Sequence, residues 1–324
     1  MTSVSVPRPP ALLVGGALLS IYLIWGSTYL ASKTALTACP PMLLSGMRFL
    51  LAGAVQYGVV RLSGAAAPSR QDWQRAALAG FCLLLCGNGG TTFSQQYIPS
   101  GLAALLVASV PMFLALLSWV SGLTPRPTVP VTVGLLLGAV GMYLLASTRI
   151  SGDVLIPGHV PLGIAAVLIA SFMWSIGSLL SKQKPVGGSP FLGVGMQMLC
   201  GGAFLLLGAL VRGEAASFQL ANVTLKAGLA FGYLIVFGSW IAFSAYIWLL
   251  RMVEPALAGT YAFVNPVVAV LLGWAFAGEE LNPQMASGAT LIVLAVMLVV
   301  LGGRRSRPQP AAEATPEPHL AVKK

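Results

Sequence analysis

The chain has 324 residues, of which 57% are hydrophobic and only 8% are charged. A soluble domain carries about a quarter charged residues, so this composition excludes a soluble globular protein and indicates an integral membrane protein. The net charge of +10 does not indicate a nucleic-acid partner, because the basic residues lie between apolar runs and in the tail rather than in one stripe.

Ten apolar segments of about membrane-spanning length follow one another along the chain. The first follows Arg8 and is too long for the apolar core of a signal peptide, so we expect an uncleaved span. The polar, Pro- and Ala-rich tail 304–324 is expected to be disordered and cytoplasmic. The predicted spans are 11–32, 41–60, 76–95, 101–121, 130–147, 161–181, 190–211, 227–249, 256–276 and 284–301.

The two halves of the chain resemble each other. A shift of 149 residues places Trp25 on Trp174 and the stretch GMRFLLAG from Gly46 on GMQMLCGG from Gly195, and 11 of the 31 positions from 24 to 54 are identical. Shared hydrophobicity alone does not give this agreement. We therefore predict two five-span repeats, 11–147 and 161–301. Because five is odd, the second repeat must cross the membrane in the opposite sense to the first.

The distribution of basic residues predicts the orientation of the chain. With the N-terminus inside, 13 Lys and Arg residues lie on the cytoplasmic side, 4 lie outside, and Arg48 lies within the membrane. By the positive-inside rule, both termini are expected in the cytoplasm.

An inverted repeat predicts a transporter that works by alternating access, with a substrate site near the midplane between the halves. Polar side chains in hydrocarbon cost free energy unless they meet a partner or a wet cavity, so polar residues that share a helix face are candidates for lining that cavity. The alternative is that Ser and Thr bond their own backbone and that Trp and Tyr mark membrane interfaces. The candidate substrate-binding residues are Trp25, Tyr29, Arg48, Asn88, Thr91, Gln95, Trp174, Ser178, Gln197, Trp240, Ser244, Tyr261 and Asn265.

Arg48 is the basic residue that falls inside a predicted span, and no acidic residue falls inside a span to pair with it. An arginine near the bilayer centre costs roughly 2.5–3.5 kcal/mol on insertion scales. One interpretation is that Arg48 faces the cavity and binds a carboxylate or similar anionic group of the substrate, with Gln197 of the other repeat opposite it. The other is that Arg48 bonds helix carbonyls or extends outward to the interface.

Two prolines and three glycines stand out within the predicted spans. Pro111 and Pro266 occupy equivalent positions near the middles of two spans, where a proline frees a carbonyl and kinks the helix. Hinges, ligand-facing carbonyls and purely structural kinks are all compatible with this pattern. Gly134, Gly138 and Gly141 allow a close helix approach, which predicts packing within the chain or between the subunits of a homodimer.

No metal or cofactor is expected. The four cysteines have no accompanying histidine cluster and are interpreted as small packing residues. His159, His319 and all eight acidic residues lie outside the predicted spans, so we predict no dedicated proton site at the midplane. A span-end acid such as Glu254, Glu279 or Glu280 is the alternative coupling group.

Several motifs, occurring in order, resemble the EamA-type drug/metabolite transporters. They are IWGSTY from Ile24, GNGG from Gly87, PSGLAALLVASVP from Pro99, and PALAGTYAFVNPVVAVLLG from Pro255, which is followed by GEEL. The resemblance covers roughly 15–301 and is closest to the YedA-like inner-membrane exporters. It implies an all-α membrane protein of ten helices, arranged as two inverted five-helix repeats around a central cavity. It also implies a small-molecule substrate, with export of metabolites such as amino acids across the inner membrane.

Three other classes of protein fit the sequence less well than a transporter. A membrane enzyme lacks support, because the spans contain no histidine for a Ser-His dyad, no paired aspartates and no zinc-binding cluster. A membrane scaffold needs neither polar helix faces nor an inverted repeat. A nucleotide-sugar carrier is expected to bury several basic residues that bind the diphosphate, whereas this chain has Arg48 alone within its predicted spans.

Overall fold

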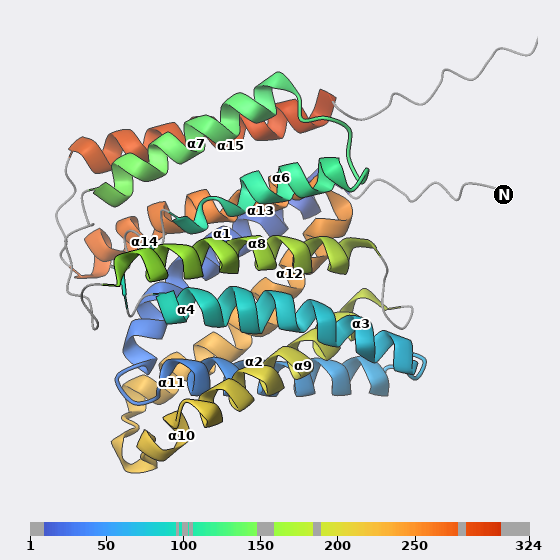
Figure 1. The fold of residues 1–324 in the computed structure, drawn as a ribbon, viewed down its shortest axis with the longest axis vertical. Coiled ribbons are helices and arrows are strands. Elements are labelled where there is room, and N and C mark those ends of the chain that lie inside the picture. Colours follow the sequence, from blue (N-terminus) through green and yellow to red (C-terminus); the bar gives the residue numbers. More distant parts are fainter. Residues whose placement is uncertain are drawn as a thin grey trace, which may run out of the picture.

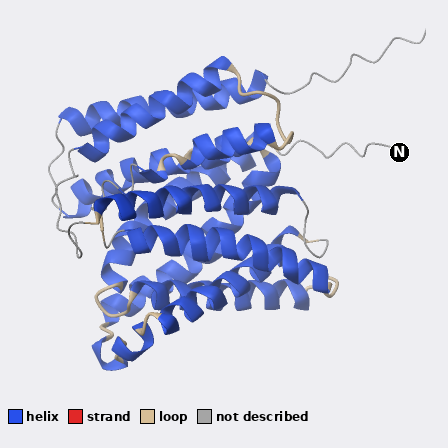
Figure 2. Ribbon diagram, in the orientation of Figure 1, coloured by secondary structure: helices blue, strands red, loops and turns tan. Residues whose placement is uncertain are grey.

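The computed structural model describes residues 10–94, 97–98, 103, 106–147, 159–183, 189–277 and 283–305. Throughout this part the regular elements are helices, which confirms the all-α prediction (Figure 2). The elements are α1 (Ala11–Ala35), α2 (Pro41–Leu62), α3 (Arg70–Gly80), the π-helix η1 (Phe81–Gly89), α4 (Gly90–Ser94), α6 (Val110–Val120), α7 (Val129–Ser147), α8 (Val160–Gln183), α9 (Pro190–Val211), α10 (Glu214–Ser217), the 3-10 helix η2 (Leu220–Asn222), α11 (Leu225–Tyr233), the π-helix η3 (Leu234–Ile241), α12 (Ala242–Met252), α13 (Pro255–Gly259), α14 (Tyr261–Ala277) and α15 (Pro283–Arg305).

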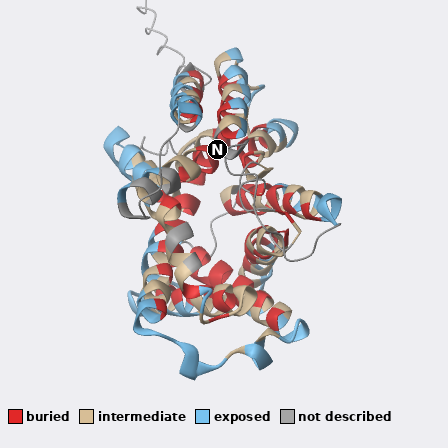
Figure 3. Cartoon of the chain, turned by 90° about the vertical axis from the view of Figure 1, so that its left-hand side faces the viewer, coloured by how far each residue is buried: buried red, intermediate tan, exposed pale blue. Residues whose placement is uncertain are grey.

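Six helical segments of the described chain are long and apolar enough to cross a membrane, and further apolar helices are shorter. Many large apolar side chains point outward from these helices, as expected where lipid rather than water surrounds the bundle, while buried residues line the interior (Figure 3). The long segments are Ala11–Thr28, Pro41–Leu62, Arg70–Ser94, Val160–Lys182, Phe191–Val211 and Leu225–Met252, and the shorter helices are Val110–Val120, Val129–Leu144 and Ala286–Gly302.

The fourth and ninth predicted spans are interrupted rather than continuous. In the fourth span the helix is broken by a turn at Ala108 and Ser109, and α6 begins at Val110. Pro111 therefore lies in the first turn of α6, where its missing N–H is not needed, and the prediction that it lies mid-helix is wrong. Pro266 does lie inside α14, and the helical segment is interrupted before it, at Thr260.

Two π-helical segments, η1 and η3, lie within the third and eighth predicted spans. A π-helix has an i→i+5 hydrogen-bond pattern, is rare, and often occurs at functional sites. Candidate residue Asn88 belongs to η1, and candidate residue Trp240 belongs to η3. The sequence carried no sign of either segment, because the apolar pattern of a π-turn is that of the α-helix around it.

The helices α2 and α9 cross at their glycines. A methyl group added at Gly53 would lie 2.9 Å from the carbonyl oxygen of Gly195, and one added at Gly202 would lie 3.0 Å from that of Gly46. Residue 53 thus faces 195 while residue 46 faces 202. This order requires the two helices to run antiparallel, with their backbones in contact.

The helices α7 and α15 form a second glycine-lined pair, side by side at one end of the molecule (Figure 1). A methyl group at Gly134 would lie 2.9 Å from Ala295 O, and one at Gly141 would lie 2.9 Å from Gly288 O, so this pair is also antiparallel. The prediction of close helix packing is confirmed for these glycines, and the packing is within the chain. The homodimer stays a prediction.

The N-terminus of α2 is capped by a residue from the other half of the sequence. The backbone N–H groups of Met42 and Leu43 donate to Glu214 Oε2 at 2.9 and 3.0 Å, and Arg212 Nε lies 3.5 Å from Glu214 Oε1. A carboxylate at a helix N-terminus satisfies free N–H groups and interacts favourably with the helix dipole.

We expect Glu214→Ala to lower the free energy of unfolding by about 1 kcal/mol, the usual effect of losing a helix cap. The midpoint of thermal unfolding in detergent measures this. Ser217→Ala, at an exposed position on the same short helix, is the control. An unchanged midpoint for Glu214→Ala would show that the cap contributes no stability.

Burial, together with the carboxylate of Glu214, raises the pKa of the Cys39 thiol to about 11. Since only the thiolate reacts, about one thiol in a thousand is reactive at pH 8. We expect the alkylation rate of Cys39 by iodoacetamide, followed by mass spectrometry, to rise about tenfold per pH unit up to about pH 11. A rate that levels off near pH 8.5 would contradict this environment.

Candidate substrate pathway

Four aromatic side chains from four helices meet in the interior and are called the aromatic cluster here: Trp25 of α1, Trp174 of α8, Tyr246 of α12 and Tyr261 of α14. The ring centroid of Trp25 lies 4.7 Å from that of Tyr261, 5.3 Å from that of Tyr246 and 6.0 Å from that of Trp174. Edge-to-face and tilted contacts of this kind are favourable. The cluster joins the two halves of the sequence, since α1 comes from the first half and the others from the second.

Tyr246 is the polar centre of the aromatic cluster and is fully buried. Trp174 Nε1 donates to Tyr246 Oη at 3.1 Å, and the Ser178 and Tyr246 hydroxyls are 2.7 Å apart. Trp174, Ser178 and Tyr261 were predicted candidates, whereas Tyr246 was missed. A tyrosine within an apolar span was the available signal.

Each tryptophan of the cluster contacts the π-helix of the opposite half. Trp25 Nε1 donates to Gly238 O in η3 at 3.0 Å. A methyl group at Gly87 in η1 would lie 2.9 Å from Trp174 Cε3. The two positions that the internal repeat equates therefore make corresponding contacts, and both contacts cross between the halves.

A groove of about 590 Å³ opens beside the first half of α1. Ser244 Oγ donates to Gln56 Oε1 at 2.9 Å, and Gln56 Nε2 donates to Phe191 O at 3.0 Å. The buried Gln56 was missed by the sequence analysis, although an amide in an apolar span is a signal that could have found it. The groove is lined by Leu13, Ala17, Gln56, Val59, Val60, Phe191, Trp240, Ile241, Ser244, Ala245 and Trp248.

Arg48 does not line the groove. Its Nε atom is buried and has no hydrogen-bond partner in the described part of the chain, and its guanidinium carbon lies 4.5 Å from the ring centroid of Phe49. Gln197 is buried and accepts a hydrogen bond from Ser181 Oγ at 3.3 Å. Among the described residues, no hydrogen bond joins Gln197 to Arg48.

Two candidate asparagines have unsatisfied side-chain oxygens. Asn88 Oδ1 and Asn265 Oδ1 are buried and have no partner among the described residues. Buried polar atoms normally have a partner, so these positions suit a water or a ligand group. Thr91 fits the alternative interpretation, in which Ser and Thr bond their own helix backbone, because its hydroxyl donates to Gly87 O at 2.8 Å. Gln95 and the side chain of Tyr29 lie outside the described residues, as do the acids Glu279 and Glu280 and the tail beyond residue 305.

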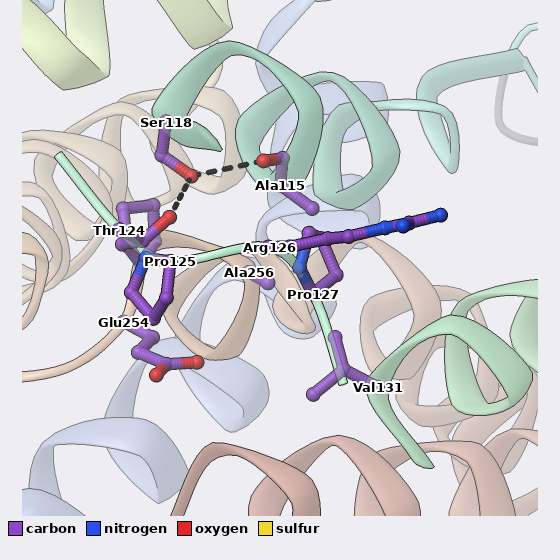
Figure 4. A pocket seen from close by; sticks show the side chains of 10 residues that line it. Ala115, Ser118, Thr124, Pro125, Arg126, Pro127, Val131, Glu254 and Ala256 are labelled. Carbon is purple, nitrogen blue, oxygen red and sulfur yellow. Dashed lines mark hydrogen bonds between the residues drawn. The ribbon is translucent and has the colours of Figure 1, made fainter. Parts of the chain in front are cut away.

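A second cavity lies between the end of α6 and the start of α13, lined in part by Glu254 (Figure 4). Thr124 Oγ1 donates to Ser118 Oγ at 3.1 Å, and Ser118 Oγ donates to Ala115 O at 3.0 Å. Its volume of about 20 Å³ is room for a water molecule but not for a metabolite. The coupling role of Glu254 stays a prediction.

Basic side chains connect the ends of α8 and α12, which carry Trp174 and Tyr246. Lys182 Nζ donates to Val253 O at 3.0 Å, and Arg251 Nε donates to Ser181 O at 3.2 Å. Each cation thus meets the carboxyl end of the neighbouring helix, where the helix dipole favours positive charge.

Among the described His, Cys, Asp and Glu residues, no group of three lies close enough together to hold a metal ion. The four cysteines are free thiols, and Cys39 and Cys82 are buried in packed surroundings.

The chain matches a transporter family model and several curated transporters. The model of the EamA-like transporter family matches residues 14–147 and again residues 161–301. The chain is 39% identical to "Uncharacterized inner membrane transporter YedA" of Escherichia coli K12, over 89% of this chain and 90% of the relative. It is 24% identical to "Uncharacterized transporter YvbV" of Bacillus subtilis, over 91% and 94% of the two chains.

A solved crystal structure has the same fold. It superimposes with a TM-score of 0.75 at 20% sequence identity and covers 90% of this chain and 98% of the other. The family match spans most of the sequence, and the relative from E. coli aligns over nearly its whole length. The chain belongs to the EamA-like transporter family.

Proposed function

We propose that the protein is a secondary transporter that exports small metabolites, the class to which amino acids belong, across the inner membrane by alternating access. Membership of a transporter family and the inner-membrane designation of the E. coli relative support this assignment. The proposed orientation has both termini in the cytoplasm, as the distribution of Lys and Arg predicts.

The transporter is proposed to consist of two inverted repeats, 11–147 and 161–301. Support comes from the antiparallel pairs: α2 and α9 are equivalent in the internal repeat, as are α7 and α15, and each pair runs in opposite directions. Equivalent helices that run antiparallel are what a two-fold axis in the membrane plane requires. The interrupted fourth and ninth spans agree with this, because discontinuous helices are common in inverted-repeat transporters.

The observation that carries the proposal is the aromatic cluster between the halves, together with the groove that lies nearer the start of α1. Ala17 lines the groove, and Trp25 of the cluster lies about two turns further along α1. At the corresponding place beside α8, this helix packs closely on α4 and on Ile98. A methyl group at Gly90 would lie 3.0 Å from Ala170 Cβ, and one at Gly163 would lie 2.7 Å from Ile98 Cγ2.

The groove thus lies at one end of the pathway, while at its counterpart these two glycines of the described chain hold α8 close to its neighbours. This asymmetry is expected for a single end state of an alternating-access cycle. In the proposed orientation the end with the groove faces the cytoplasm, where an exporter takes up its substrate. The candidate residues that line or adjoin this pathway are proposed to contact the substrate as it passes, and the hinge roles of Pro111 and Pro266 remain part of the proposal.

The test is an untargeted comparison of metabolites in the medium of overexpressing and deletion cells, followed by uptake of the identified compound into proteoliposomes. We expect saturable movement that Trp25→Phe and Trp174→Phe both slow, because each loses its indole N–H donor while keeping a ring. Val55→Leu, at an outward-facing position on α2, is the control. A purified protein that moves none of the identified compounds would favour a membrane scaffold instead. Preference for a nucleoside diphosphate sugar would favour the nucleotide-sugar carrier.

A further inference from the structure

Among the described residues, no charged side chain lines the groove beside α1. Three of its lining residues are aromatic (Phe191, Trp240 and Trp248), and two are polar (Gln56 and Ser244). The others are aliphatic. Ligand sites are typically apolar with a few placed polar groups, and the groove volume of about 590 Å³ falls within the usual range.

The two polar residues retain a limited hydrogen-bonding capacity. Gln56 Nε2 has one proton on Phe191 O, and Gln56 Oε1 accepts from Ser244 Oγ. An amide nitrogen has two protons, and each of the two oxygens has a further lone pair. The pair can therefore offer a ligand one donor and one or two acceptors, and no net charge.

The rim of the groove opens onto the outward-facing apolar surface. Leu13, Val59 and Phe191 are 57%, 50% and 47% exposed. All three lie on helices that are apolar enough to span the membrane. A molecule that partitions into the bilayer could therefore reach the groove from the side.

We propose that this groove takes up neutral, mainly apolar molecules with one or two hydrogen-bonding groups, such as aromatic nitrogen heterocycles, in preference to zwitterionic amino acids. The inference rests on the proposed function for its transport role, but binding can be tested without transport. An ammonium or carboxylate placed here would be desolvated without a counter-charge, which is strongly unfavourable. Arg48, the cation in the second span, is not among the lining residues.

The experiment measures binding of radiolabelled indole to the purified full-length protein in nanodiscs by scintillation proximity, with unlabelled competitors. Indole, L-tryptophan, tryptamine and indole-3-acetate share one ring and differ in charge. We expect unlabelled indole to compete saturably, and each charged or zwitterionic compound to compete at least about tenfold more weakly. L-tryptophan competing as well as indole, or no saturable indole binding, would overturn the proposal.

Variants locate the site. Ala245→Phe fills the groove and is expected to abolish saturable binding, whereas Gln56→Leu, which keeps the volume but loses the amide, should weaken it about tenfold. Val55→Leu, outside the groove on the same helix as Gln56, should bind as wild type. Wild-type affinity in Ala245→Phe would place binding elsewhere and overturn the proposal, even if Gln56→Leu fails to fold. Indole binding without transport of any metabolite would count against the proposed function and leave this inference standing.

Discussion

Gly53→Leu is expected to prevent stable folding. The missing side chain at Gly53 is what allows α2 and α9 to touch: an added Cβ would lie 2.8 Å from Leu199 N and 2.9 Å from Gly195 O. Both are backbone atoms of a packed helix and cannot rotate away. The helices must separate, at a cost of about 3 kcal/mol. This is a large fraction of the roughly 5–15 kcal/mol by which a typical protein domain is stable, so little folded protein is expected.

The matched control for this prediction is Gly58→Leu. Gly58 lies on the same helix, and a Cβ there would meet no atom within 4 Å. Helix propensity should make this change neutral or slightly stabilising. The yield of monodisperse protein and its thermal midpoint in detergent measure both variants. Equal behaviour of the two would contradict the close α2–α9 crossing.

Bridging the groove is expected to stop transport. Ala17 of α1 and Ala245 of α12 both line the groove, and they belong to opposite halves of the chain. If this end must close in the other state of the cycle, a bifunctional thiol reagent joining Ala17→Cys to Ala245→Cys will hold one state. We expect transport to fall to roughly a tenth or less, since a lid or gate that cannot close blocks turnover. Cleavage of a disulfide-containing bridge should restore it.

The control pair is Val131→Cys with Val299→Cys, across α7 and α15. These two residues belong to one packed cluster, and the glycine contacts hold their helices together. Bridging them should leave most of the transport rate, because this pair is proposed to support the pathway rather than to open and close. Both pairs require a background in which the native cysteines are replaced by alanine. Full transport with the Ala17–Ala245 bridge in place would count against alternating access through this groove.

Much of the architecture follows from residue patterns that act locally. Apolar length predicted most of the helices. The repeat identified Trp25 and Trp174 as equivalent. In the structure the centroids of these two rings lie 6.0 Å apart. Glycine spacing predicted a close helix approach for Gly134 and Gly141, because the requirement for a small residue can be read without knowing the partner.

The side-chain contacts that the sequence did not reveal depend on which residues from other helices lie opposite. Gln56 binds Ser244 and Phe191, which lie far along the chain, so its role cannot be seen from α2 alone. Gln197 was matched to Arg48 by alignment, but its contact is with Ser181. Thr91 looks polar in a helical projection, yet its hydroxyl is already used by its own backbone. Periodicity shows which way a side chain points but not whether its hydrogen bonds remain free.

The α2–α9 contact also bears on how the protein is assembled during synthesis. The glycine face of α2 and its N-terminal cap both find their partners in residues made much later, on α9 and at Glu214. Until those residues leave the ribosome, Gln56 of α2 also lacks its hydrogen-bond partners Phe191 and Ser244. The first half is thus an incomplete intermediate rather than a self-sufficient module, and cells that make the two halves as separate chains should need both together for either to escape degradation.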